Sequence, residues 1–109
     1  MANVINWFEI PVNDIDRATK FYTSVLGGEF QNVEMYGIKM AFFPMTDQKD
    51  VGGSLCQGEG YKPTMDGPKI YLNGGEDLSA PLAKVEKAGG KVTMPKTKIN
   101  DDIGYMAFF

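Results

Sequence analysis

The chain has 109 residues, 43% of them hydrophobic and 23% charged, with a formal net charge of −3 at pH 7. These values are ordinary for one compact domain, and they exclude a disordered or fibrous chain and a strongly basic nucleic-acid binder. Histidine is absent, which removes the commonest general base and the commonest transition-metal ligand.

The chain begins with a predicted strand and a predicted helix. Apolar residues alternate over residues 7–12, as in a half-buried strand, and recur at three- and four-residue spacing over residues 15–26, as on one face of a helix. Asn13 or Asp14 is the expected N-cap of that helix, because either side chain accepts a hydrogen bond from an early backbone amide. Gly27 is expected to end the helix in the left-handed conformation.

Three more strands are predicted after this helix. A tight turn at residues 36–37 separates the first two, and a polar loop at residues 46–50 precedes the third. Residues 58–68 are rich in glycine and proline and read as a linker. The three strands cover residues 29–35, 38–43 and 51–57.

The second half of the chain repeats the first. The tetrapeptide MAFF at residues 40–43 recurs 66 positions later at residues 106–109. The glycine pair that starts at Gly27 recurs 62 positions later at Gly89. Nearly equal offsets indicate an internal duplication. The sequence therefore predicts one domain of two tandem modules, residues 1–57 and 69–109, joined by the linker.

The second module is predicted to hold a strand, a helix and two strands. Its helix covers residues 78–88, with Ser79 as the expected cap, Pro81 in the first turn and Gly89 at the end. Its strands cover residues 70–73, 91–97 and 105–109. No residues remain to repeat the strand 51–57, so we expect an exposed apolar sheet edge, covered either by a continuation of the chain or by a partner subunit.

The expected location is the cytoplasm. Cys56 is the single cysteine, so the sequence offers no internal disulfide. No apolar run approaches the length of a membrane span, and residues 1–4 lack the charged and apolar regions of a secretory signal. We expect neither a membrane nor a nucleic acid as a partner.

Two segments resemble a known family. VNDIDRA at residues 12–18, FY at 21–22 and VLGG at 25–28 resemble the first fingerprint of the vicinal oxygen chelate superfamily, which includes glyoxalase I, bleomycin-resistance proteins and extradiol dioxygenases. Residues 78–92 are similar to its second fingerprint. The resemblance implies an α+β fold of two tandem βαβββ modules whose curved mixed sheet surrounds a cavity, the second module lacking its last strand here.

The resemblance also implies which residues line that cavity. If the apolar residues at 8, 10 and 12 pack under the helix, their neighbours Trp7 and Glu9 face the cavity. Lys69 and Tyr71 occupy the matching positions of the second module. The predicted substrate-binding residues are Trp7, Glu9, Gln57, Lys69 and Tyr71.

A metal site of the family type is not expected. The first family ligand falls at Trp7, which cannot ligate a metal, and its counterpart falls at Lys69 or Ile70. Gln57 and Cys56 are the remaining candidates, and the last family ligand would lie on the missing strand. We therefore expect no cofactor.

Individual residues allow more than one role. Glu9 is the candidate catalytic residue, as a general base or the partner of a cationic ligand; alternatively it forms an ion pair, with Lys69 for example. Trp7 is either a stacking platform or a core residue, and Tyr71 is either a hydroxyl donor or an ordinary sheet residue. Cys56 lacks an activating histidine and is read as a buried small residue.

Three functions follow from these residues and the resemblance. The leading hypothesis is a protein that binds a small organic molecule without a family-type metal and forms a homodimer. The second is a metal-dependent lyase or isomerase of the glyoxalase kind, with Glu9 as base. The third is a resistance protein that sequesters a drug.

Overall fold

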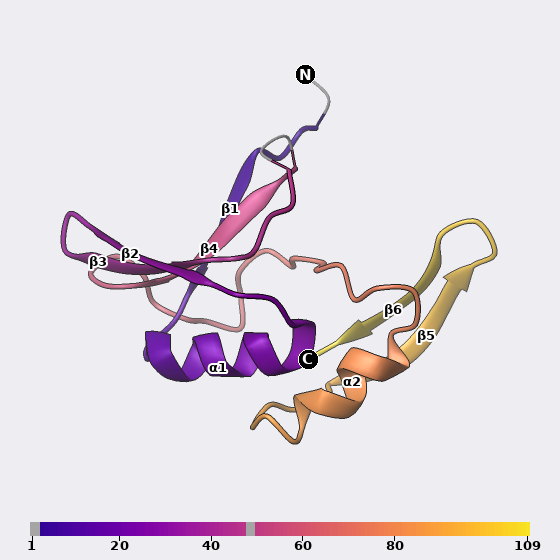
Figure 1. The fold of residues 1–109 in the computed structure, drawn as a ribbon. Helices are drawn as coiled ribbons and strands as arrows, with labels where there is room; N and C mark the ends of the chain where they lie inside the picture. The colour runs from indigo at the N-terminus through magenta and orange to yellow at the C-terminus, as the bar shows by residue number, and fades with distance from the viewer. Residues whose placement is uncertain (1–2, 48–49) are drawn as a thin grey trace. The chain divides into compact units, whose positions relative to one another are not determined.

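The computed structural model describes residues 3–47 and 50–109. Its contacts divide the chain into two compact units (Figure 1). Unit 1 comprises Met1–Thr19 and Gly28–Gly67, and unit 2 comprises Lys20–Gly27 and Pro68–Phe109. Helix α1, Ile15–Leu26, contributes residues to both units.

Unit 1 contains a mixed four-stranded sheet with strand order β1-β4-β3-β2. β1 is parallel to β4, whereas β3 is antiparallel to both β4 and β2. Together with α1, this arrangement is a βαβββ module and confirms the predicted α+β class. The strands are β1 Trp7–Pro11, β2 Gln31–Met35, β3 Ile38–Phe42 and β4 Gly52–Gln57.

The ends of α1 follow from local chemistry. Oδ1 of Asp14 accepts a hydrogen bond from the amide of Arg17 at 3.2 Å, which is the predicted N-cap bond. Gly27 has φ +80°, and its amide donates to the carbonyl of Thr23 at 2.8 Å. A residue with a Cβ would be strained at this φ, so glycine ends the helix as predicted.

The core of unit 1 includes buried side chains of the two central strands of the sheet. Ala41 of β3 and Leu55 of β4 are fully buried side by side in the register. The rings of Phe8 and Phe30 both pack against Phe43, with centroids 5.4 and 4.7 Å apart. Burial of these apolar side chains is the main force that holds the sheet together.

Unit 2 contains a two-stranded antiparallel sheet and a short helix. Helix α2 is Ser79–Val85, and the sheet pairs β5, Met94–Asn100, with β6, Gly104–Phe108. Val85 is 1% exposed. The ring of Phe109 lies 5.8 Å from Phe21, a residue that α1 contributes to this unit.

The predicted strand at residues 70–73 is wrong, because this segment forms no strand. A strand needs a hydrogen-bonding partner. In unit 1 the matching strand, β1, pairs with β4. The 109 residues hold no second copy of β4, so the segment has no equivalent ladder to join.

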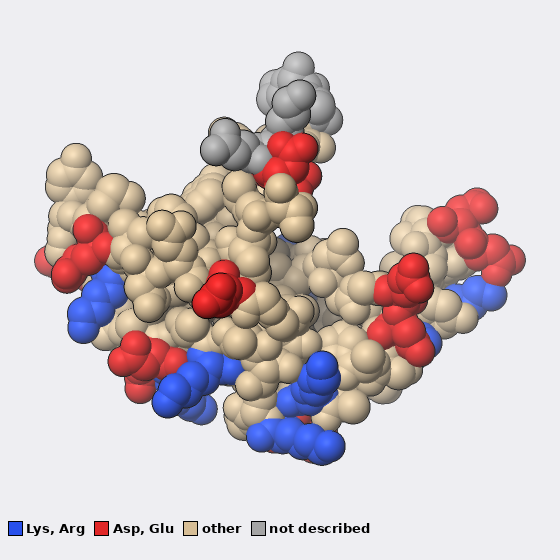
Figure 2. Space-filling view, in the orientation of Figure 1, with Lys and Arg blue, Asp and Glu red and all other residues tan. Residues whose placement is uncertain are grey.

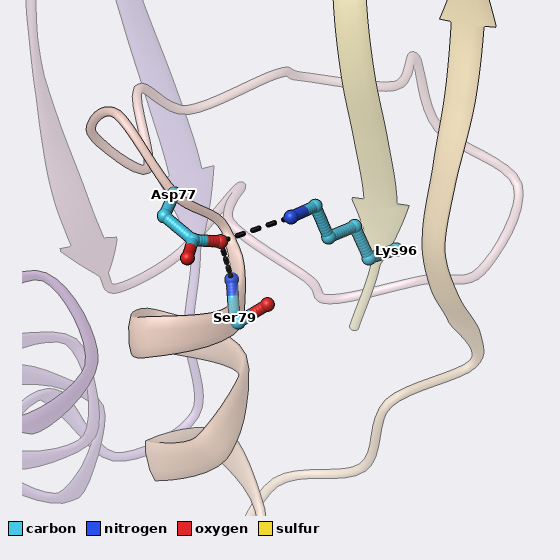
Figure 3. Close-up of polar contacts among 3 residues, drawn as sticks. All are labelled: Asp77, Ser79 and Lys96. Carbon is cyan, nitrogen blue, oxygen red and sulfur yellow. Dashed lines mark hydrogen bonds and ion pairs between the residues drawn. The ribbon is translucent and has the colours of Figure 1, made fainter.

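The start of α2 differs from the prediction that Ser79 caps it. Leu78 occupies the N-cap position without a side-chain cap bond, and Ser79 is the first helical residue. Oδ1 of Asp77 accepts from the amide of Ser79 at 2.9 Å and pairs with Nζ of Lys96 at 3.0 Å (Figure 3). The hydrogen bonds from the backbone amide of Ser79 and from the Lys96 side chain lower the pKa of Asp77 to about 2.

The end of α2 also differs from the prediction. The helix stops at Val85 rather than at residue 88. The amide of Gly90 donates to the carbonyl of Val85, and that of Gly89 donates to Glu86, which is the Schellman pattern. Gly89 has φ +99°, so it ends the helical turns as predicted. The following strand, β5, begins three residues later than expected.

Candidate functional site

Two of the predicted site residues, Trp7 and Glu9, lie on the same face of the unit 1 sheet. The register pairs Trp7 with Gly52, Glu9 with Ser54 and Pro11 with Cys56. Directly opposed residues point to the same side of a sheet, so these side chains share one face. We call this surface the Glu9 face.

Glu9 is held by a residue from the segment that follows β4. The phenol of Tyr61 donates to Oε1 of Glu9 at 2.7 Å. A turn brings Tyr61 back to the strand: its amide donates to the carbonyl of Gly58 at 3.1 Å, and Gly60 has φ +89°. Because a type II turn requires φ above zero at its third residue, glycine suits this place.

The hydrogen bond to the Glu9 carboxylate raises the pKa of Tyr61 to about 12. The phenolate would face a negative charge and lose its donated bond, so the neutral form is favoured. Tyr61 is therefore a hydrogen-bond donor at neutral pH rather than a base. Its role in this geometry is to orient the carboxylate.

A buried pair lies on the strand beside Glu9. Ser54 and Cys56 are fully buried, with Oγ and Sγ 3.2 Å apart. Burial raises the pKa of the Cys56 thiol; Ser54 lowers it by hydrogen bonding, and the charge of Glu9 raises it. The thiol thus stays protonated at neutral pH, which argues against a nucleophile. The prediction of a buried Cys56 is confirmed.

Trp7 presents part of its ring to solvent on the Glu9 face. It is 40% exposed and makes an edge-on contact with Phe42, with centroids 5.3 Å apart. A Cβ on Gly52 would lie 2.8 Å from the Trp7 ring and would collide with Met45. Glycine at this position therefore lets the indole lie across β4.

Gln57 does not join Glu9, because consecutive strand residues point to opposite faces. Its Oε1 accepts a hydrogen bond from the amide of Ile15 at 2.8 Å, at the first residue of α1. Gln57 thereby satisfies one of the backbone amides that every helix start leaves unpaired.

The two remaining predicted site residues lie in unit 2. Nζ of Lys69 is 4.9 Å from the ring centroid of Phe108, and the ring of Tyr71 is 5.8 Å from it. Both residues belong to the irregular segment before α2. Unit 1 therefore carries three of the predicted site residues, two of them on the Glu9 face, and unit 2 carries the other two.

The donor set of unit 1 does not fit a metal site of the family type. Trp7 has no lone pair for a metal, Gln57 is engaged at the helix on the opposite face, and the Cys56 thiol is held neutral. Within the described ranges, no group of three or more cysteine, aspartate or glutamate side chains could hold an ion.

Sequence reasoning missed Tyr61 and Ser54. Tyr61 lies in the predicted linker, where Gly58 and Gly60 are the turn signal that precedes it. Ser54 could be identified only from the register, which places it opposite Glu9.

Charge is dispersed on the visible face of the molecule. Figure 2 shows acidic and basic side chains in small groups separated by uncharged residues. No helix in the described part of the chain has both the length and the apolar character that a bilayer crossing requires.

Comparisons with known proteins agree with this fold. The family described as bleomycin resistance protein-like N-terminal matches residues 5–44. A glyoxylase-like domain-containing protein from Didymella fabae is 30% identical over 113 residues, covering 96% of this chain and 83% of that protein. An integron cassette protein from the mobile metagenome of V. cholerae superposes with a TM-score of 0.53 at 19% identity, covering 98% of this chain and 84% of that one.

Proposed function

Since the chain belongs to the glyoxalase and bleomycin-resistance family of the vicinal oxygen chelate superfamily, we propose that it binds a small organic molecule on the Glu9 face. In this proposal no family-type metal takes part. Trp7 supplies a stacking surface, and Glu9 accepts hydrogen bonds from the ligand.

The hydrogen bond between Tyr61 and Glu9 is the observation that carries the proposal. A carboxylate offers about four lone-pair sites, and Tyr61 occupies one of them. The phenol fixes the carboxylate in one orientation while leaving capacity for a ligand. An oriented acceptor beside a partly exposed indole suits a planar molecule that carries N–H or O–H donors.

The proposal extends to the other unit. Lys69 and Tyr71 stand 62 positions after Trp7 and Glu9. In unit 2, Lys69 would offer a positive charge and Tyr71 a hydroxyl to a ligand. We further propose that the protein acts as a cytoplasmic homodimer.

A thermal-shift screen tests this function. The purified chain is heated with planar metabolites that carry hydrogen-bond donors, with a cationic glycopeptide drug, and with Mg²⁺, Mn²⁺, Ni²⁺ or Zn²⁺. A bound ligand raises the melting temperature by mass action. The expected result is a saturable shift with an organic ligand that is lost in Glu9→Gln.

The other functions predict different results. A stoichiometric divalent ion in the purified chain, found by elemental analysis, would replace the proposal by the metal-dependent lyase or isomerase with Glu9 as base. A shift with the drug alone would favour sequestration. An organic ligand bound equally by the wild type and Glu9→Gln would show that the site lies elsewhere. Light scattering tests the homodimer.

A further inference from the structure

Met45, in the segment between β3 and β4, lies against the ring of Trp7. A Cβ on Gly52 would collide with Sδ of Met45 and would lie 2.8 Å from Cζ3 of Trp7. Since the sulfur and the ring would both touch this one atom, they lie within the roughly 5 Å that is usual for sulfur–aromatic contacts. Gly52 has no side chain, so the thioether and the indole meet above β4.

The side chain of Met45 is open to solvent. Met45 is 42% exposed, whereas Met40, which lies on β3, is 8% exposed. Oxidants reach the thioether of an exposed methionine more readily than that of a buried one. Met45 therefore combines an accessible, oxidisable sulfur with a contact to the indole that the proposed ligand site uses.

We propose that Met45 is a site of oxidation by peroxides and that its sulfoxide releases the indole of Trp7. The thioether sulfur attacks one oxygen of hydrogen peroxide: an S–O bond forms, the O–O bond breaks, and the other oxygen leaves as water with both hydrogens. The sulfur is oxidised by two electrons, and the peroxide is reduced by two. Methionine sulfoxide reductases reverse this modification.

The sulfoxide does not suit the place that the thioether sulfur occupies. Oxidation turns a flexible apolar side chain into a polar one, whose oxygen accepts hydrogen bonds. The ring carbons of Trp7 that face Met45 cannot donate one, so an oxygen placed against them would lose its hydrogen bonds to water. The oxidised side chain should therefore turn toward solvent, and the indole should lose this contact.

Release of the indole would act on the proposed ligand site, and in this respect the inference rests on the proposed function. Contacts with Met45 and Phe42 hold the indole in one orientation on the Glu9 face. A released indole must be ordered again when a ligand stacks on it, which lowers the affinity. The oxidation and the loss of the contact are measured without a ligand, so their failure is distinguishable from failure of the thermal-shift screen.

Peptide mapping after treatment with hydrogen peroxide tests the modification. Met40 and Met45 fall in one tryptic peptide, residues 40–49, so fragmentation compares the two within a single sample. In the native chain Met45 should be oxidised at least roughly tenfold faster than Met40, and in urea the two rates should become equal, because burial no longer protects Met40. Equal rates in the native chain would overturn the proposal.

Fluorescence tests the release of the indole, because Trp7 is the single tryptophan of the chain. The indole is 40% exposed before oxidation, so quenching by acrylamide should rise at least roughly 1.5-fold once Met45 is oxidised. Treatment with methionine sulfoxide reductases should reverse the rise. Met45→Leu, which forms no sulfoxide, should show no rise. Met65→Leu is the matched control: Met65 is 95% exposed, and its replacement should leave the rise intact.

Two results would contradict the release of the indole. One is an equal rise in Met45→Leu, and the other is unchanged quenching in the wild type after mapping has shown the Met45 sulfoxide. Circular dichroism verifies that the variants fold. If Met45→Leu does not fold, reversal by the reductases in the wild type decides the question, and a rise that persists after reduction of Met45 would overturn the proposal.

Discussion

Tyr61 and Glu9 are joined by a 2.7 Å hydrogen bond although they lie 52 residues apart in the sequence. The parallel pairing of β1 with β4 brings them together, because Tyr61 follows β4 after one turn. The carboxylate on β1 is thus oriented by a side chain that belongs to no strand or helix.

The titration of Tyr61 should report on this bond. In the wild type its pKa is raised to about 12 by the hydrogen bond to Glu9. Glu9→Gln removes the negative charge, so the pKa should fall toward the ordinary value of about 10. Phenolate absorbance measures the shift, and subtraction of the Tyr61→Phe titration isolates this residue among five tyrosines.

The hydrogen bond between Tyr61 and Glu9 should also make the stability of the protein depend on pH. A raised folded-state pKa means that the stabilisation is fully present below about pH 10 and is lost as the pH rises through about 12. Tyr61→Phe should lack this loss. A titration curve unchanged by Glu9→Gln would show that the bond is not formed in solution.

Gln57 should matter for stability and not for ligand binding. Gln57→Leu leaves the amide of Ile15 without its acceptor, so the free energy of unfolding should fall by about 1 kcal/mol in urea denaturation. The affinity for a ligand found in the screen should stay within about twofold, since Gln57 faces away from Glu9.

Gln31→Leu is the matched control for that change. Gln31 is exposed on β2, so its free energy of unfolding should change by no more than about 0.5 kcal/mol. If Gln57→Leu weakened ligand binding as strongly as Glu9→Gln does, Gln57 would belong to the binding site after all.

Gly53→Ala should destabilise unit 1. The added methyl group would collide with the ring of Phe8 in the core. Overpacking of this kind costs about 1–3 kcal/mol, measurable by chemical denaturation. Gly67→Ala is the control, because its nearest neighbour would be 4.0 Å away and its φ is not in the left-handed region. Equal stability of the two variants would contradict the packing.

Asp77 should make unit 2 sensitive to acid. Its pKa is lowered to about 2 by the amide of Ser79 and by Lys96. The stabilisation is therefore present above about pH 4 and is lost as the pH falls toward 2. Between pH 5 and pH 2, the melting temperature of Asp77→Asn should therefore fall less than that of the wild type.

Asp77 makes an ion pair with Lys96 and a hydrogen bond with the amide of Ser79, and added salt should weaken mainly the ion pair. Its ion pair with Lys96 is exposed, so 0.5 M NaCl should reduce the difference between the wild type and Asp77→Asn. Asp102→Asn, in the turn after β5, is the matched control and should follow the wild type. Identical acid melting of Asp77→Asn and the wild type would argue against the contact.

The sequence alone determined the elements whose signals are local. The cap candidates Asn13 and Asp14 predicted the start of α1, Gly27 predicted its end, and apolar alternation predicted the strands of unit 1 to within two residues. Caps and left-handed glycines act on the few residues beside them, so no distant partner is needed. The duplication likewise predicted the equivalent places of the two MAFF strands.

The tertiary structure decided what depends on partners. Residues 70–73 have the composition of a strand and form none, because a strand exists only with a neighbour to share its hydrogen bonds. Gln57 and Cys56 are adjacent in the sequence, but the pleat of β4 directs them to opposite faces. Gln57 contacts the start of α1, whereas Cys56 lies beside Ser54. The register between β1 and β4 decides that Ser54 lies opposite Glu9. A shift of one residue would direct the Ser54 side chain to the other face of the sheet.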